Sequence, residues 1–274
     1  MHDPSKVLVT LADHSYIEQA KQIFSSAVHC SGWNGDLLLL SHSIPRTSLQ
    51  WFVERGICVH ECDTLFTSRT RWQSVVFSKY YLFSVKMKQW RQVVFVEGDA
   101  MIQSSVEHLT GTVGFAAVAT PFSAEKAWRD HFHQQPAGLY EKLLSENSRS
   151  GLFFNSGVMA FSTEIIGDDT FNDLIALTKI YLPICKLPEQ AILNIYFRKT
   201  WSAVDPRYNL LRNLLTRELS TEVRREYLDA VLCRNAAILH FSGTSEKPWH
   251  SDNPYHGKWR ANLSLADAIR VSAL

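Results

Sequence analysis

The sequence feature that most constrains the fold is a short apolar run that stops at two carboxylates. Residues Gln92 to Val96 are followed directly by Glu97-Gly98-Asp99. A Val-rich run of this length, preceded by charged residues, predicts a strand buried on both faces of a parallel sheet. Glu97 and Asp99 would then lie at its carboxyl end, where open α/β sheets bind ligands, with both side chains pointing the same way. A divalent cation is the common partner of such a pair, and an acidic loop that ends the strand in water is the alternative.

Other short apolar segments alternate with helical patterns along the chain. Strands are predicted at Lys6 to Leu11, Asp36 to Ser41, Ile57 to Cys62, Phe115 to Thr120 and Ala236 to Leu239. Helices are predicted at Ile17 to Ala27, Leu49 to Glu54, Phe77 to Trp90 and Thr170 to Ile180, and from Pro188 onward. This alternation predicts an α/β fold with a mostly parallel sheet flanked by helices. No Gly-rich phosphate loop follows the first strand, so a bound nucleotide would be held in another way.

Two further segments allow more than one interpretation. The polar stretch from Ser123 to Ser150 favours a surface connection, with a lid or acceptor platform as the alternative. His131 and His133 lie in it and are interpreted as surface residues. Core or surface packing is the interpretation of six tryptophans: Trp33, Trp51, Trp72, Trp90, Trp128 and Trp201. In Phe153 to Phe161, the polar Asn155-Ser156-Gly157 forms either a turn or a close approach of backbone to a ligand.

Composition sets the limits on partners and on location. Lys and Arg number 28 and Asp and Glu 27 among 274 residues, so no overall charge attracts nucleic acid or an anionic membrane. The five cysteines are an odd number without metal-type pairing, which is typical of reduced thiols. They are Cys30, Cys58, Cys62, Cys185 and Cys233. With no leader-like start and no 18-residue apolar span, we expect a cytoplasmic protein without a transmembrane segment.

Two basic residues near the end of the chain extend the carboxylate hypothesis. His240 follows the last predicted strand, and a His with two carboxylates is an ordinary site for a divalent cation. The imidazole favours Mn²⁺ over Mg²⁺. Lys247 follows a flexible turn and precedes Pro248, where it provides a point charge for a phosphate. Surface positions for both residues are the alternative.

Read in order, these and other segments resemble the retaining glycosyltransferases of family 8, the group of glycogenin and the lipopolysaccharide galactosyltransferases. The segments are Val9-Thr10-Leu11 with Tyr16, Lys79, Glu97-Gly98-Asp99, Phe154-Asn155-Ser156-Gly157-Val158, Glu189-Gln190-Ala191-Ile192-Leu193-Asn194, Tyr208-Asn209 and His240-Phe241-Ser242-Gly243 with Lys247-Pro248-Trp249. The resemblance implies a GT-A fold, Rossmann-like, in one domain over residues 1–274. About 1–120 would bind the nucleotide sugar, and about 121–274 would shape the acceptor side.

The resemblance also implies roles for individual residues. The uracil and ribose would be held by Leu11, Asp13 and Tyr16, and the donor by Lys79. The metal, Mn²⁺ with Mg²⁺ as the alternative, would be bound by Glu97, Asp99 and His240, where Glu97 replaces the usual Asp. The pyrophosphate would meet Gly243 and Lys247. The transferred sugar would lie against Asn155 and Ser156, and the catalytic positions would be Glu189 and Gln190.

The implied activity is metal-dependent transfer of a hexose from a UDP-sugar with retention, by a front-face displacement in which the departing phosphate takes the acceptor's proton. The acceptor, whether carbohydrate, protein or small molecule, is not given by the sequence, which also leaves a homodimer open. A nucleotide-sugar hydrolase and a catalytically silent UDP-sugar-binding protein are the competing functions.

Overall fold

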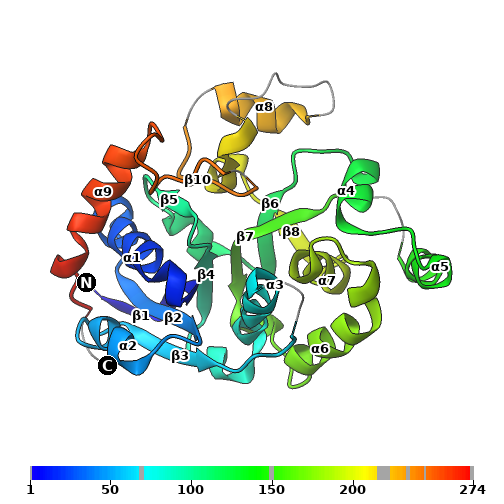
Figure 1. Cartoon of the computed structure of the whole chain (residues 1–274), viewed down its shortest axis with the longest axis horizontal. Helices are drawn as coiled ribbons and strands as arrows, with labels where there is room; N and C mark the ends of the chain where they lie inside the picture. Colours follow the sequence, from blue (N-terminus) through cyan, green and yellow to red (C-terminus); the bar gives the residue numbers. More distant parts are fainter. Residues whose placement is uncertain are drawn as a thin grey trace.

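A seven-stranded mixed sheet forms the centre of the molecule (Figure 1). Its strands, in spatial order, are β3 (Cys58–Cys62), β2 (Gly35–His42), β1 (Asp3–Asp13), β4 (Gln92–Val96), β7 (Phe154–Ser162), β6 (Phe115–Ala119) and β8 (Trp201–Ala203). The computed structural model describes residues 2–67, 71–147, 151–214, 223–232, 235–243 and 245–271. Every strand predicted from the sequence is present within this part of the chain.

Strand directions confirm a mostly parallel sheet. β1 pairs in parallel with β2 and β4, β2 with β3, and β6 with β8. β7 is antiparallel to both of its neighbours, β4 and β6. As a result, the beginning of β7 lies beside the carboxyl end of β4. A second, three-stranded sheet consists of β5 (Ala100–Ile102), β10 (Ile238–His240) and β9 (Leu210–Leu211).

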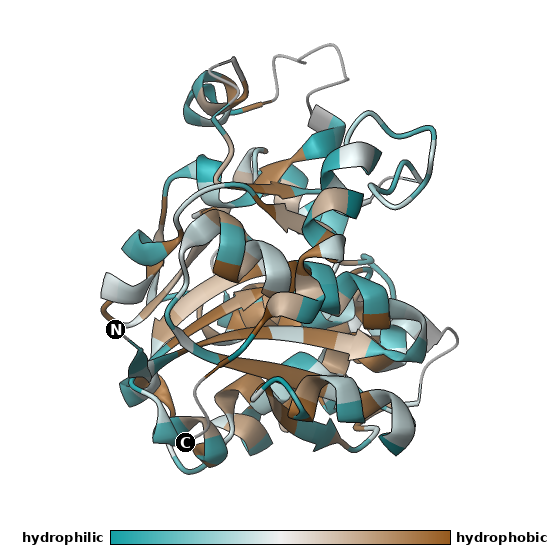
Figure 2. Cartoon of the chain, turned by 90° about the vertical axis from the view of Figure 1, so that its left-hand side faces the viewer, coloured by the Kyte–Doolittle hydropathy of each residue, from teal (hydrophilic) through white to brown (hydrophobic). Residues whose placement is uncertain are grey.

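Helices cover both faces of the large sheet, and apolar strands run through the middle of the molecule (Figure 2). Side chains alternate along β4: Val94 and Val96 pack in one core, Val93 and Phe95 in the other. The first core includes α1 (Ile17–Ser31), α2 (Arg46–Val53), α8 (Arg225–Leu232) and α9 (His256–Ser264). The second includes α4 (Ala124–His131), α5 (Ala137–Glu146), α6 (Thr170–Tyr181) and α7 (Pro188–Tyr196). Burial of these two apolar layers is the main favourable contribution to folding.

The segment predicted as a helix from Phe77 to Trp90 is built differently. The short helix α3 (Arg71–Val76) leads into the 3₁₀ helices η2 (Phe77–Phe83) and η3 (Val85–Gln89), separated by an extended Ser84. Most of η2 is buried, so a one-sided helical pattern does not apply to it. The other 3₁₀ helices are η1 (His14–Tyr16), η4 (Glu107–Gly111), η5 (Thr163–Ile165), η6 (Leu182–Ile184), η7 (Pro206–Asn209), η8 (Arg212–Leu214) and η9 (Ala266–Ala268).

The two ambiguous segments are now defined. Residues 123–147 are not a plain surface connection, because they form α4 and α5 and bury Trp128 and His131, whereas His133 is exposed as expected. Asn155-Ser156-Gly157 is not a turn, because β7 runs through it. Four cysteines are free thiols, and Cys233 lies outside the described residues. None of the helices within the described ranges is both long and apolar enough to cross a bilayer.

Candidate active site

Glu97, Asp99 and His240 meet where the two sheets adjoin. Glu97 follows β4, and β5 begins directly after Asp99. The antiparallel register of β5 and β10 sets His240 opposite Ala100 and therefore beside Asp99. Nε2 of His240 lies 3.1 Å from Oδ1 of Asp99 and 3.3 Å from Oε2 of Glu97. One ligand atom from each residue falls within 4.8 Å of the others, a grouping suited to a cation.

Charges in this triad support one another. Burial alone would lower the pKa of His240, but Asp99 and Glu97 outweigh it and raise the pKa to about 9. Burial would likewise raise the pKa of Glu97, but Lys79 and His240 lower it to about 2. Asp99 has a lowered pKa because His240 and Lys247 outweigh its burial. The carboxylates therefore stay ionised across the neutral range.

The donor set fits Mn²⁺ or Mg²⁺. Two carboxylates and an imidazole provide oxygen and nitrogen ligands, and Nδ1 of His240 lies 2.8 Å from Oδ1 of Asn209, which can only accept. That bond directs Nε2 toward the carboxylates. Because metals bind neutral imidazole, a bound cation would displace the proton that Nε2 shares with Asp99.

Lys247 lies on the other side of Asp99. Its Nζ is 2.7 Å from Oδ2 of Asp99 and 2.7 Å from the carbonyl oxygen of Phe241. Lys247 therefore lies close to the carboxylates, as predicted. Gly243 has a φ of 65°. It is not among the described residues that line the two cavities on either side of Glu97. Thr244 in the same turn lies outside the described residues.

Lys79 lies between two carboxylates and is 1% exposed. Its Nζ is 2.9 Å from Oε1 of Glu97 and 3.2 Å from Oε2 of Glu189. One ammonium can compensate only one of these two carboxylates. Glu97, which also faces His240, keeps its charge, whereas burial raises the pKa of Glu189 to about 7 even though Lys79 opposes it.

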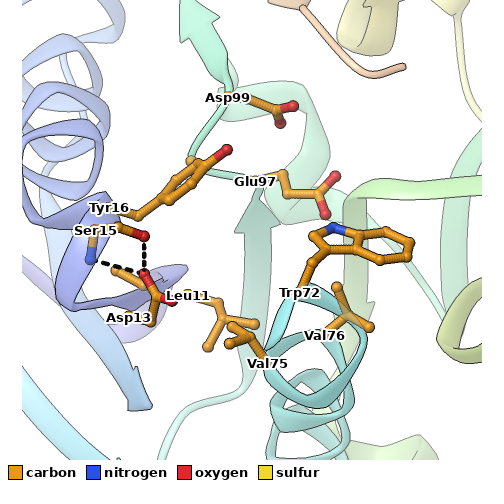
Figure 3. Close-up of a pocket in the computed structure, with 11 residues that line it drawn as sticks. Leu11, Asp13, Ser15, Tyr16, Trp72, Val75, Val76, Glu97 and Asp99 are labelled. Carbon is orange, nitrogen blue, oxygen red and sulfur yellow. Dashed lines mark hydrogen bonds between the residues drawn. The ribbon is translucent and has the colours of Figure 1, made fainter. Parts of the chain in front are cut away.

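A cavity of about 270 Å³ opens beside Glu97 and Asp99 (Figure 3). Tyr16 forms one wall, and Trp72, Val75 and Val76 from α3 form the facing wall. Glu97 and Asp99 lie at one end, and the rest of the lining is Leu11, Ala12, Asp13, Ser15 and Gly98. The Asp13 carboxylate accepts hydrogen bonds from the backbone nitrogen and the hydroxyl of Ser15, which holds it in place. A cleft with one polar end and apolar walls suits a base attached to a charged group.

A smaller cavity of about 90 Å³ lies on the other side of Glu97. Its polar lining includes Lys79, Asn155, Ser156, Glu189 and Gln190, all from the predicted site. Its apolar lining includes Trp72, Leu187 and Pro188. Glu97 and Trp72 therefore border both cavities. Asn155 and Ser156 reach this cavity because β7 runs antiparallel to β4, which brings its first residues to the end of β4.

Sequence reasoning missed several of these residues. Trp72 is predicted to serve in core or surface packing, yet this 55% exposed side chain lines both cavities. Asn209 had no assigned role, although it contacts His240. His131 was assigned to the surface, yet it is 2% exposed and contacts Gln190. Only the apolar positions Ala127 and Trp128, on the same helix, could have indicated that His131 faces inward.

Comparison with known proteins identifies the class. The chain resembles the crystal structure of the galactosyltransferase LgtC with donor and acceptor sugar analogues, with a TM-score of 0.70 and 17% identity over 96% of both chains. It also resembles the apo bifunctional glycosyltransferase WbbM, with a TM-score of 0.72 and 16% identity, over 96% of this chain and 50% of that one. The fold is therefore that of the GT-A glycosyltransferases.

The family follows from the sequence comparisons. Residues 42–253 match the model of glycosyl transferase family 8, and the chain belongs to that family. Galactinol synthase 5 of Arabidopsis thaliana is 22% identical over 81% of this chain and 66% of its own length. The glycosyltransferase GlyF of Streptococcus pneumoniae is 23% identical over 90% of this chain and 58% of its own. The chain thus spans less than two thirds of the length of each of these two relatives.

Proposed function

We propose that this protein is a metal-dependent, retaining hexosyltransferase that uses a UDP-sugar. The observation that carries the proposal is the position of Glu97. Its carboxylate belongs to the cation-binding triad and also separates a larger cavity, open toward Tyr16, from a smaller one lined by Lys79 and Glu189. A diphosphate at the triad would direct its nucleoside into the first cavity and its sugar into the second.

The larger cavity supports the role proposed for the N-terminal half. All its described lining residues lie between Leu11 and Asp99, within the predicted nucleotide-sugar-binding part of residues 1–120. Leu11 and Tyr16 offer surfaces for a base, and Asp13 offers carboxylate oxygens for ribose hydroxyls. Tyr16 is fixed by an edge contact with Trp249, at 5.6 Å between ring centroids. Its orientation is therefore set before a ligand arrives.

The leaving UDP would be stabilised at the triad. Lys247 faces this position, and its ammonium would exchange Asp99 for a phosphate oxygen. A divalent cation held by Glu97, Asp99 and His240 would neutralise the negative charge that grows as the bond between sugar and phosphate breaks. Lys79 keeps Glu97 ionised and in place for that task.

The smaller cavity would hold the hexose. Oε2 of Glu189 is bound by Lys79 and Ser156, whereas its Oε1 has no hydrogen-bond partner among the described residues. We infer that Oε1 accepts a sugar hydroxyl. A partly protonated, buried Glu189 is a weak nucleophile, which favours front-face displacement over a covalent intermediate. Gln190 and Asn155 would then lie beside the developing oxocarbenium ion.

The decisive experiment is calorimetric titration with UDP in the presence of Mn²⁺ and again with a chelator, followed by UDP release from UDP-galactose, UDP-glucose and UDP-N-acetylglucosamine. The names of the galactinol synthases and the galactosyltransferase make UDP-galactose the first donor to test. Tight UDP binding only with Mn²⁺ would support the proposal. Equal binding in chelator would contradict the metal site.

Product analysis separates the competing functions. UDP release that rises with added acceptor, with a glycosidic product, supports a transferase. Release of free sugar at the same rate with or without acceptor supports a hydrolase. Binding of UDP without release from any donor supports a silent binding protein.

A further inference from the structure

A continuous line of hydrogen bonds joins the metal-site histidine to a second buried histidine on α4. It passes through three side-chain carboxamides, which we call the amide relay: Gln190, Asn155 and Asn209. At one end, Nε2 of Gln190 lies 2.8 Å from Nε2 of His131. At the other end, Oδ1 of Asn209 lies 2.8 Å from Nδ1 of His240. His131, Asn209 and His240 are each at most 2% exposed.

Backbone groups fix the direction of the relay at its Gln190 end. Nδ1 of His131 lies 2.7 Å from the carbonyl oxygen of Ala127, which can only accept, so Nδ1 carries the proton. Nε2 of the neutral ring therefore accepts, and the Gln190 amide nitrogen donates to it. The backbone nitrogen of Ser156 fixes the same orientation of the Gln190 carboxamide independently, because it donates a hydrogen bond of 3.0 Å to Oε1 of Gln190.

The same reasoning continues to His240. The backbone nitrogen of Gly157 donates over 3.0 Å to Oδ1 of Asn155, so the Asn155 amide nitrogen must face Oε1 of Gln190, at 3.1 Å. Asn209 then donates from Nδ2 to Oδ1 of Asn155 over 2.8 Å. Its own Oδ1 is left to accept from Nδ1 of His240. Every carboxamide in the relay has one allowed orientation.

The relay requires His131 to be neutral. A proton on Nε2 would set an N–H donor against the Gln190 amide nitrogen, and Gln190 would have to rotate and give up Ser156. Burial lowers the pKa of His131 to about 4, and Ala127 and Asp130 oppose this only in part. The ring therefore keeps its acceptor at neutral pH.

We propose that His131 is a positioning residue for sugar transfer, which orients the Gln190 carboxamide and, through the amide relay, Asn155 at the smaller cavity. The proposal rests on the proposed transferase function, because Gln190 and Asn155 act there on the sugar. His131 lines neither described cavity, so its effect must pass through Gln190. Loss of the acceptor should impair the transition state more than donor binding, since misplaced groups act mainly on the chemical step.

The test uses two replacements of similar size. His131→Gln keeps a carbonyl oxygen near the place of Nε2, whereas His131→Met offers only a thioether. With UDP-galactose and UDP-glucose as probes, His131→Met should lower kcat for UDP release by about tenfold to a hundredfold and change KM by less than about threefold. His131→Gln should restore most of kcat. In a Gln190→Ala background, His131→Met should cause little further loss.

The outcomes separate this proposal from the transferase proposal. Equal losses in His131→Met and His131→Gln, or losses that add fully to Gln190→Ala, would overturn a positioning role. Nitrogen NMR of ¹⁵N-histidine-labelled protein should show His131 with its proton on Nδ1, and a proton on Nε2 would overturn the relay. Wild type that releases UDP from no donor would count against the transferase, while the NMR measurement would still test the relay.

Discussion

Gly157 and His240 face each other so closely that only a glycine fits at position 157. A Cβ there would lie 2.2 Å from Cε1 of His240 and 2.8 Å from Oε2 of Glu97. Both distances are far below van der Waals contact, so β7 passes directly against two of the three candidate cation-binding side chains. The backbone of Gly157 also accepts the amide of Glu97, over 2.8 Å. One residue thus supports Glu97 and leaves room for His240.

Gly157→Ala should therefore weaken Mn²⁺ binding by about tenfold or more, because the imidazole or the strand must move away from ligand geometry. Calorimetric titration with Mn²⁺ and UDP measures this loss. Gly138→Ala on α5 is the matched control, since a Cβ at Gly138 meets nothing within 4 Å. Unchanged Mn²⁺ affinity in Gly157→Ala would contradict the assigned ligands.

Asp99→Asn should reduce UDP release by about a hundredfold or more, because a neutral amide neither holds a divalent cation well nor pairs with Lys247. The exposed Asp168→Asn serves as control and should retain wild-type rates. Full metal-dependent transfer by Asp99→Asn would show that the site lies elsewhere.

Lys79→Met should lower the free energy of unfolding by about 3 to 5 kcal/mol, because it leaves Glu97 and Glu189 without their shared cation. Denaturant titration at pH 7.5 measures the loss. Adding Glu189→Gln should recover part of it by removing one unpaired carboxylate. Strict additivity of the two changes would argue against a shared ion pair.

Glu189→Gln should become more stabilising as pH rises. The pKa of Glu189 is raised from an ordinary 4.5 to about 7 in the folded protein. Its contribution to stability is therefore complete below about pH 4.5 and is lost as pH rises through 7, whereas glutamine does not titrate. Relative to wild type, the free energy of unfolding of the variant should increase by up to about 3 kcal/mol between pH 4.5 and 8.

Thermal unfolding of both proteins across that range provides the measurement. The exposed Glu125→Gln on α4 is the control and should follow wild type at every pH. Parallel curves for Glu189→Gln and wild type would show that Glu189 is ionised throughout.

Much of the fold was predictable because the strands are short, apolar and separated by charged or turn residues. The apolar run before Glu97 became β4, and the one before His240 became β10. The mostly parallel sheet flanked by helices and the family were also predicted correctly. The order of the motifs predicted that Glu97, Asp99, His240 and Lys247 lie together, which the structure confirms. The roles of these residues, a cytoplasmic location and a homodimer stay predictions.

The remainder depended on contacts between segments far apart in sequence. His131 lies in a polar segment, and only the packing of α4 against α7 reveals its contact with Gln190. The sequence around Trp72 does not indicate a place at the site, because only the tertiary fold sets α3 beside the cavities. The run at Phe77 was misassigned as one α-helix because apolar spacing does not distinguish α from 3₁₀ geometry over so few residues.

The antiparallel course of β7 and the pairing of β5 with β10 have a consequence for how the enzyme matures. Asp99 and His240 are 141 positions apart, and Gly157 must pack against both His240 and Glu97. A nascent chain that has emerged only as far as β5 holds Glu97 and Asp99 but lacks His240, so its site is incomplete. Cation affinity should therefore arise late in refolding, after most helical structure has formed, so that metal binding reports the completed assembly of the sheet.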